Sequence, residues 1–389
     1  MRQLESANAI SVSMDARPDT LPGLGSRVPG LSIAVVGPDG LRWAGGVGLA
    51  DLATRTPATP HTVYPWFSMT KLVTATAVLQ LCERGRLALD APVARYYAPF
   101  GALRPAPWTA GVTVRHLLSH SAGLPNPLPL RWVHPADRPG PEPGVFVAGL
   151  LARHPRLRSA PGARGAYSNL GYLILGELIA AVAGQPYEDY VREHILVPLG
   201  MARTDFRYTD ALAATAATGY QRRWSAMTPL LRALLPPGIL GVPTGRFVTF
   251  RRFYVDGAAY GGLIGPVDDA ARFLRAHLGA GHAREGGLLT PASVALMQRL
   301  AVRGAQRDFG LGWFRPRARR ADPPPFIEHL GGGAGFWNDM RLYPALGLGT
   351  VVMGNATAYD HEAIGQRLLA RWGGHAGVPA AAATRGGVA

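Results

Sequence analysis

The sequence predicts an α+β fold: an antiparallel sheet flanked by helices and joined to a mainly helical lobe. Three observations lead to this prediction. Strand-like segments lie near both ends of the 389-residue chain, helix-like segments fill most of the interval between them, and 48% of the residues are hydrophobic. That apolar content is enough for a large buried core. Because strands occur at both ends, we expect them to share one sheet.

The first elements are expected soon after residue 28. Residues 31–36 are a short apolar run, Gly37-Pro38-Asp39-Gly40 is a turn signal, and residues 41–49 again have strand character, so this region predicts a β-hairpin. Residues 68–84 contain many apolar side chains and neither Gly nor Pro, and Gly85 follows them. This pattern predicts a mostly buried helix that ends at the glycine.

The middle of the chain is expected to form the helical lobe, and its end returns to strands and a final helix. Helices are predicted at 170–183, 187–196, 267–278 and 361–372, and strands at 309–314, 327–330, 339–343 and 348–354. The predicted organisation is one domain over 28–372, with an α/β lobe (about 28–85 and 288–372) and a helical lobe (about 86–287). A flexible segment is expected at 1–27 and a disordered tail at 373–389.

Composition and charge indicate which binding partners and which cellular location to expect. The formal net charge is +15, but the basic residues are scattered among 49 Gly and 34 Pro, so a nucleic-acid partner is not expected. The start of the chain lacks the apolar core of a secretory signal, and no apolar run approaches the roughly twenty residues of a membrane span. A cytoplasmic location is therefore expected, and the oligomeric state stays open.

One segment leaves two interpretations open. Residues 222–260 combine arginines with an apolar stretch that Pro and Gly interrupt. They form either a buried or packed loop, or a lid or a surface that faces lipid, so weak association with a membrane surface stays open.

The clearest chemical signal is Phe67-Ser68-Met69-Thr70-Lys71 at the start of the predicted buried helix. Ser68 and Lys71 are three residues apart, so their side chains lie on one helix face within reach of each other. Lys71 is the only lysine among 40 basic Lys and Arg residues. Lysine can lose its proton near neutral pH when buried, whereas guanidinium cannot. Lys71 can therefore activate the Ser68 hydroxyl as a nucleophile.

Two later segments add polar groups. Tyr167-Ser168-Asn169 precedes the predicted helix at 170–183; Tyr167 can move a proton and Asn169 can anchor a ligand, although a packed ring and a helix cap explain the pair equally well. The segment from His329 through Gly331 and Gly332 places a histidine before glycines whose backbone a substrate could approach. This glycine run is not a phosphate loop, because the Gly-Lys-Ser/Thr ending is missing.

In order and spacing, Ser68-x-x-Lys71, Tyr167-x-Asn169 and His329-x-Gly331 resemble the three motifs of the serine β-lactamase and penicillin-binding-protein superfamily, specifically its class C-like branch with the family VIII esterases. The resemblance extends over residues 28–372 and implies the β-lactamase/transpeptidase-like fold. It also implies a role for each matching residue. Ser68 would be acylated, Lys71 and Tyr167 would transfer protons, the backbone N–H groups of Ser68 and Gly332 would bind the oxyanion, and Asn169, His329 and Gly331 would contact substrate or Lys71.

The third motif departs from the family's frequent Lys-Thr-Gly, because Leu330 stands where a hydroxyl helps to hold a substrate carboxylate. A leucine cannot make that hydrogen bond. The sequence therefore predicts a serine hydrolase that forms an acyl-enzyme and cleaves a small carboxylic ester or amide without a free carboxylate at that position. The alternatives are a β-lactamase or D-Ala-D-Ala carboxypeptidase, a transacylase, and a catalytically silent binding protein with this fold.

No metal ion and no organic cofactor are expected. His116 and His120 are four residues apart, but the glutamate of a zinc peptidase is missing between them. No serine lies in a Gly-x-Ser-x-Gly elbow, which disfavours the α/β-hydrolase class.

Overall fold

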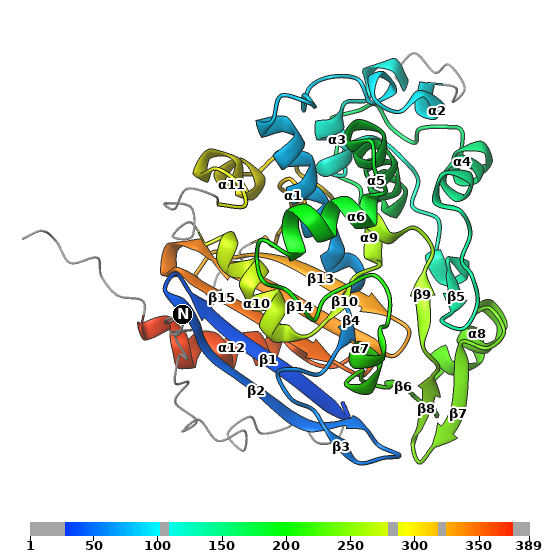
Figure 1. Cartoon of the computed structure of the whole chain (residues 1–389), viewed down its shortest axis with the longest axis vertical. Helices are drawn as coiled ribbons and strands as arrows, with labels where there is room; N and C mark the ends of the chain where they lie inside the picture. Colours follow the sequence, from blue (N-terminus) through cyan, green and yellow to red (C-terminus); the bar gives the residue numbers. More distant parts are fainter. Residues whose placement is uncertain (1–27, 102–108, 279–286, 318–323, 376–389) are drawn as a thin grey trace, which may run out of the picture.

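A computed structural model of the chain describes residues 28–101, 109–278, 287–317 and 324–375. Its largest sheet has eight strands, all paired antiparallel, in the order β11-β12-β13-β14-β15-β1-β2-β3 (Figure 1). The strand bounds are β1 Gly30–Gly37, β2 Gly40–Asp51, β3 Thr56–Pro57, β11 Asp308–Phe309, β12 Phe314–Arg315, β13 Ile327–Gly333, β14 Phe336–Tyr343 and β15 Leu348–Gly354. Because β1 pairs with both β2 and β15, the two ends of the chain share one sheet and the predicted fold class is confirmed.

Helices cover both faces of the sheet at β1. All eight β1 residues are buried, and alternate side chains enter different cores, as the two-residue period of a strand requires. Ile33 and Val35 pack in the core that contains helix α12 (His361–Trp372), whereas Ala34 and Val36 lie in the large core that contains α10 (Val267–Ala276). Helix α10, which the predicted boundary at 287 assigns to the helical lobe, therefore packs on the sheet.

Helix α1 (Thr70–Glu83), which a 3-10 turn (Phe67–Met69) precedes, was expected in the α/β lobe but packs among the helices of the helical lobe. Residues 70–81 are all buried, and α1 packs against α5 (Asn169–Ala183) and α9 (Ala258–Gly261). The predicted buried helix is thus confirmed, and Gly85 follows it with a positive φ of 68°. The remaining helices are α2 Ala98–Gly101, α3 Val114–Leu118, α4 Pro143–Arg153, α6 Tyr187–Val191, α7 Asp210–Ala214, α8 Met227–Leu234 and α11 Pro291–Gln298.

Two expectations need correction. Residues 309–314 are not one strand but the turn of the β11-β12 hairpin, because Gly312 adopts a positive φ of 87° that reverses the chain. The helical lobe also contains three small sheets: β6-β8-β7, β5-β9 and β4-β10. Their strands are β4 Tyr64–Pro65, β5 Val133–Pro135, β6 Gly219–Arg222, β7 Leu240–Thr244, β8 Phe247–Phe250, β9 Phe253–Val255 and β10 Ile264–Gly265.

The expected flexible segment at 1–27 lies outside the described residues, as does the part of the expected tail from 376 onward. Within the tail, Gly373–His375 forms a 3-10 turn that continues from α12. Among the helices of the described residues, none is long and apolar enough to cross a membrane.

Candidate active site

Ser68 lies in the 3-10 turn that leads into α1, and this turn contacts strands β13 and β14 of the large sheet as well as helix α9. The preceding residue, Phe67, has a positive φ of 47°, which is uncommon for a bulky residue. The Phe67 ring is held by rings at 6.1 and 6.3 Å, those of Phe253 and Phe336. Backbone strain of this kind collects at functional sites, where the surrounding packing maintains it.

Lys71 is buried one helical turn after Ser68. Its Nζ lies 3.1 Å from Ser68 Oγ and donates a hydrogen bond to the Tyr260 carbonyl oxygen at 2.7 Å. Burial holds the pKa of Lys71 well below its usual value, because an ammonium group loses hydration there. A neutral amine beside a hydroxyl is the arrangement that a general base needs.

Tyr167 completes the group around the Ser68 hydroxyl. The Tyr167 hydroxyl donates to Ser68 Oγ at 2.7 Å, although the two residues are 99 positions apart. Burial raises the pKa of Tyr167, and the hydrogen bond to Ser68 opposes this only in part. The phenol therefore keeps its proton at neutral pH, so it can act as a proton donor and Lys71 remains the candidate base.

The structure places Asn169 differently from the role that the resemblance implies. Asn169 is the first residue of α5, and its N–H donates to Asn126 Oδ1 at 3.0 Å. The helix cap is Ser168, whose side chain accepts from the Gly171 N–H. Among the described residues, no hydrogen bond joins Asn169 to Lys71, and the buried Asn169 Oδ1 has no partner. The Tyr260 carbonyl holds the amine instead.

The third motif lies on β13, beside the turn that carries Ser68. His329 is buried with its ring stacked on Phe314 at 4.1 Å, and its Nδ1 contacts the Leu330 carbonyl oxygen at 2.9 Å. Burial and the charge of Lys71 lower the pKa of His329. A Cβ on Gly331 would lie 2.2 Å from the Trp66 carbonyl oxygen. Gly331 therefore allows β13 to approach the Ser68 turn closely.

A cavity of about 630 Å³ opens at Ser68. Its lining includes Ser68, Tyr167, Leu330 and Gly332, but neither the buried Lys71 nor the buried His329. Two guanidinium-bearing residues, Arg164 and Arg307, and the rings of Phe309, Phe314 and Trp337 complete much of the wall. The cavity therefore offers a nucleophile, apolar walls and two cations, which suits a small organic substrate.

His120 is a residue of this region whose part the sequence did not reveal. It is buried with a positive φ of 54°. Its carbonyl oxygen accepts from the Ala166 N–H at 2.7 Å, and its Nδ1 accepts from the Ser168 N–H at 3.1 Å. The N–H groups of the residues on either side of Tyr167 are thus both bonded to His120, whose ring lies 4.6 Å from the Tyr167 ring. His120 is in a position to orient Tyr167.

Replacing His120 with alanine is expected to slow acylation by roughly ten- to a hundredfold, because a displacement of about 1 Å in a reacting group has that effect. His120→Asn should restore most of the rate, since asparagine tolerates a positive φ and can place an acceptor near the former Nδ1. Steady-state kinetics that separate kcat from KM, together with melting temperatures, make the comparison. Equal impairment in two well-folded variants would mean that His120 does not act through this hydrogen bond.

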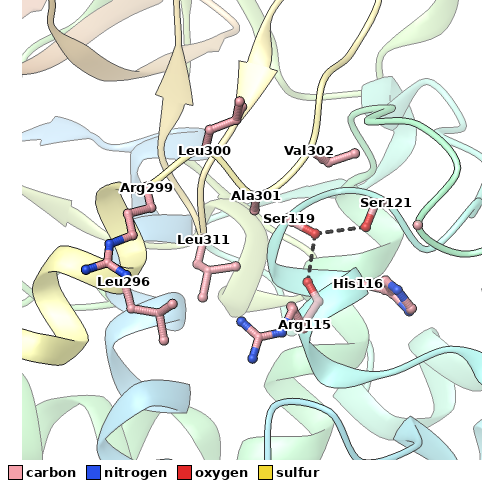
Figure 2. Close-up of a pocket in the computed structure, with 11 residues that line it drawn as sticks. Arg115, His116, Ser119, Ser121, Leu296, Arg299, Leu300, Ala301, Val302 and Leu311 are labelled. Atoms are coloured by element: carbon pink, nitrogen blue, oxygen red, sulfur yellow. Dashed lines mark hydrogen bonds between the residues drawn. The ribbon is translucent and has the colours of Figure 1, made fainter.

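A second cavity, of about 300 Å³, lies between the 115–121 segment and residues 296–302 (Figure 2). Its walls include Arg115, Ser119, Ser121, Arg299 and Leu300, and the hydroxyls of Ser119 and Ser121 bond to each other at 2.9 Å. None of the predicted site residues lines it.

The described residues contain no group of three His, Cys, Asp or Glu side chains placed to hold a metal ion. His116 and His120, which stand four apart in the sequence, each use Nδ1 to accept a backbone N–H, from Thr113 and Ser168 respectively.

Comparison with known proteins agrees with this geometry. The sequence model of the family described as Beta-lactamase matches residues 13–371. The chain belongs to the beta-lactamase family. Family membership confirms the resemblance seen in the motifs, and its match begins before the expected domain start at residue 28. The relatives of the chain are serine hydrolases, and an acyl-enzyme mechanism is typical of the family.

Three proteins that are similar to this chain carry different names. Esterase EstB of Burkholderia gladioli is 32% identical over 80% of this chain and 82% of its own length. D-alanyl-D-alanine-carboxypeptidase/endopeptidase AmpH of Escherichia coli is 26% identical over 74% of this chain and 69% of its own. The octameric penicillin-binding protein homologue from Pyrococcus abyssi has a TM-score of 0.70 and 26% identity, covering 89% of this chain and 74% of its own.

Proposed function

We propose that this serine hydrolase is acylated on Ser68 and cleaves small carboxylic esters or amides that lack a free carboxylate beside the scissile bond. The contact of Lys71 Nζ and the Tyr167 hydroxyl with one Ser68 oxygen carries the proposal. Leu330 lines the same cavity, and the motif resemblance implies that a hydroxyl at this position would hold a carboxylate. The similarity to a protein named Esterase EstB supports this choice of substrate class.

The contacts suggest an order of proton transfers. Neutral Lys71 takes the Ser68 proton as Oγ attacks the carbonyl carbon, and the backbone N–H groups of Ser68 and Gly332 are the proposed donors to the oxyanion. Tyr167 then protonates the leaving oxygen or nitrogen, because its hydroxyl lies 2.7 Å from the attacking atom. The proton that Lys71 took from Ser68 passes to the Tyr167 oxygen, which returns both groups to their starting states. Water attacks the acyl-enzyme in a second, similar cycle and releases the acid, so one ester and one water give one alcohol and one acid.

The experiment that tests this function is peptide mapping by mass spectrometry after exposure to p-nitrophenyl esters of several acyl lengths and to a β-lactam. The expected result is an ester-derived acyl group on the peptide that contains Ser68, together with release of p-nitrophenol. An acyl group on another residue, or neither adduct nor turnover with any ester, would contradict the proposal. The dependence on acyl length would define the substrate further.

A second candidate function is the cleavage of a substrate that carries a carboxylate, as in a β-lactamase or D-Ala-D-Ala carboxypeptidase. The observation that favours it is the presence of Arg164 and Arg307 in the cavity wall, because guanidinium groups bind carboxylates well. Arg307 lies over the ring of Phe314 at 4.5 Å. The similarity to AmpH also supports this candidate.

Leu330→Thr separates the two candidates. If the cavity is built for neutral substrates, the added hydroxyl can bind the carboxylate of a β-lactam. Acylation of Ser68 by that β-lactam should then become roughly tenfold faster, since a hydrogen bond to a charged group stabilises by about 1.5 to 3 kcal/mol. Acylation by a neutral ester should change by less than about threefold. Leu330→Val is the control, because valine has the shape of threonine without the hydroxyl.

The contrary outcome has two forms. Equal rates for Leu330→Thr and Leu330→Val would show that a hydroxyl at this position does not contact the carboxylate. Alternatively, the unmodified protein reacts as fast with the β-lactam as with esters, and Arg307→Gln slows the β-lactam alone. That second result would favour the carboxylate-binding candidate.

A further inference from the structure

The region around α8 has an unusual charge composition. From residue 211 to residue 255 the chain contains no Asp or Glu. The same stretch contains six arginines, all of them exposed: Arg222, Arg223, Arg232, Arg246, Arg251 and Arg252. This part of the surface is therefore strongly positive, whereas the sequence as a whole has its basic residues scattered.

Large apolar side chains are exposed among these arginines. Trp224 is 81% exposed, and Met227 and Leu230, which are three residues apart on α8, are 45% and 47% exposed. The helix buries Thr228 and Leu231 against the protein, so Met227 and Leu230 form a separate strip that faces outward. We call Arg223, Trp224, Met227, Leu230 and Arg232 the α8 face.

Helix α8 lies at the outer edge of the molecule (Figure 1), and hydrogen bonds connect its start to neighbouring strands. The Arg223 N–H donates to the Arg246 carbonyl oxygen at 2.8 Å, and the Thr228 hydroxyl donates to the Arg222 carbonyl oxygen at 2.7 Å. These bonds tie the start of α8 to the β6-β8-β7 sheet. The guanidinium of Arg223 lies over the Trp224 ring at 4.8 Å. The apolar side chains are thus presented to solvent by an ordered element.

A partner for the α8 face must satisfy two requirements together. It must supply negative charge for the arginines and an apolar phase for Trp224, Met227 and Leu230. A bilayer with anionic headgroups does both, because tryptophan favours the headgroup boundary and basic residues are attracted to the charged surface. A nucleic acid supplies the charge alone.

We propose that the α8 face docks the protein onto the surface of an anionic lipid bilayer. The protein then lies on the membrane without crossing it, since the apolar strip is short and arginines flank it. The α8 region also adjoins the β13-β14 turn: the Tyr220 N–H on β6 donates to the Gly335 carbonyl oxygen at 3.1 Å. The proposal does not depend on the proposed function, because docking is measured without turnover.

The test is co-sedimentation of the full chain with vesicles of phosphatidylcholine, with and without phosphatidylglycerol. Binding should require phosphatidylglycerol and weaken at about 1 M salt, where the Debye length falls to about 3 Å. The variant Arg223→Gln/Trp224→Ser/Arg232→Gln should bind at least 25-fold more weakly, since each basic residue near an anionic surface adds roughly fivefold.

A matched control removes the same kinds of side chain elsewhere. The control variant is Arg299→Gln/Leu300→Ser/Arg303→Gln. These three residues follow α11, which is far from α8 in Figure 1. Figure 2 shows Arg299 and Leu300. The control variant loses the same charge and one exposed apolar residue, and it should sediment like the unmodified protein.

Three results would overturn the proposal. The unmodified protein stays in solution with anionic vesicles, or the control variant loses as much binding as the α8 variant. The third result is a dimer seen without vesicles that the α8 substitutions abolish, in which case a second copy of the chain covers this face.

Discussion

Ser68→Ala is expected to abolish formation of the acyl-enzyme and to lower ester turnover by roughly 10⁶-fold, the scale seen when a serine hydrolase loses its nucleophile. The physical reason is that both groups around the hydroxyl act through one oxygen. Lys71 Nζ and the Tyr167 hydroxyl lie 3.1 and 2.7 Å from Ser68 Oγ, and neither can attack the substrate in its place. Stopped-flow release of p-nitrophenol and intact-protein mass after quenching give the two readouts.

Ser293→Ala is a suitable control for this substitution. Ser293 lies in α11 and does not line the cavity at Ser68, so the control should keep its acyl adduct and its turnover. If Ser68→Ala retained the adduct, the nucleophile would have to be another residue. Melting temperatures of both variants show whether the fold is intact.

The second large effect is expected from Lys71→Arg, which should slow acylation by about 10² to 10⁴-fold, the usual contribution of a general base. Arginine keeps a positive charge in this position but cannot lose its proton near neutral pH. The substitution therefore separates basicity from charge. Lys71→Gln, which is neutral and also not a base, should be impaired to a similar extent. An arginine variant with nearly normal rates would exclude Lys71 as the base.

The pH dependence of acylation provides an independent measure of the same group. Burial lowers the pKa of Lys71, so the amine is protonated and inactive only at lower pH. The rate should rise with pH through that lowered pKa and then stay level, because the raised pKa of Tyr167 keeps the phenol protonated. The rings of Tyr167, Tyr172 and Tyr260 lie 5.0 to 5.6 Å from Nζ and favour the cation. The midpoint of the rise therefore reports the balance between burial and these rings. A rise only near the usual lysine pKa would mean that burial does not lower it in solution.

Part of the site could be predicted from the sequence because the residues concerned are close together along the chain. Ser68 and Lys71 are neighbours on one helical turn, so their spacing alone predicts the contact. The apolar runs at 31–36 and 348–354 predicted strands, and these strands pair directly as β1 and β15. The final helix was expected at 361–372 and occurs as His361–Trp372. In each case the period of apolar residues along the chain carries the information.

Other features depend on contacts between distant parts of the chain. The Tyr260 carbonyl that holds Lys71 is 189 residues away and belongs to the backbone, so no residue type marks it. His120 is a similar case, because it accepts hydrogen bonds from the N–H groups of Ala166 and Ser168, which lie 46 and 48 positions further along the chain. The segment predicted as one strand at 309–314 is a hairpin turn because Gly312 has a positive φ. The apolar pattern of the sequence does not show the φ of a glycine, so the prediction missed this turn.

The sequence by itself therefore determined the fold class, the family resemblance and the pairing of a nucleophile with its candidate base. The tertiary structure alone decided which groups hold Lys71 and Tyr167, and it brought Arg164 and Arg307 into the same cavity wall. It also showed that residues 222–260 are packed only in part, since Leu231 and Ile239 are buried whereas Trp224, Met227 and Leu230 are exposed. The physical reason is that helical turns and strand periods are encoded by near neighbours, whereas burial and backbone hydrogen bonds depend on how distant segments pack.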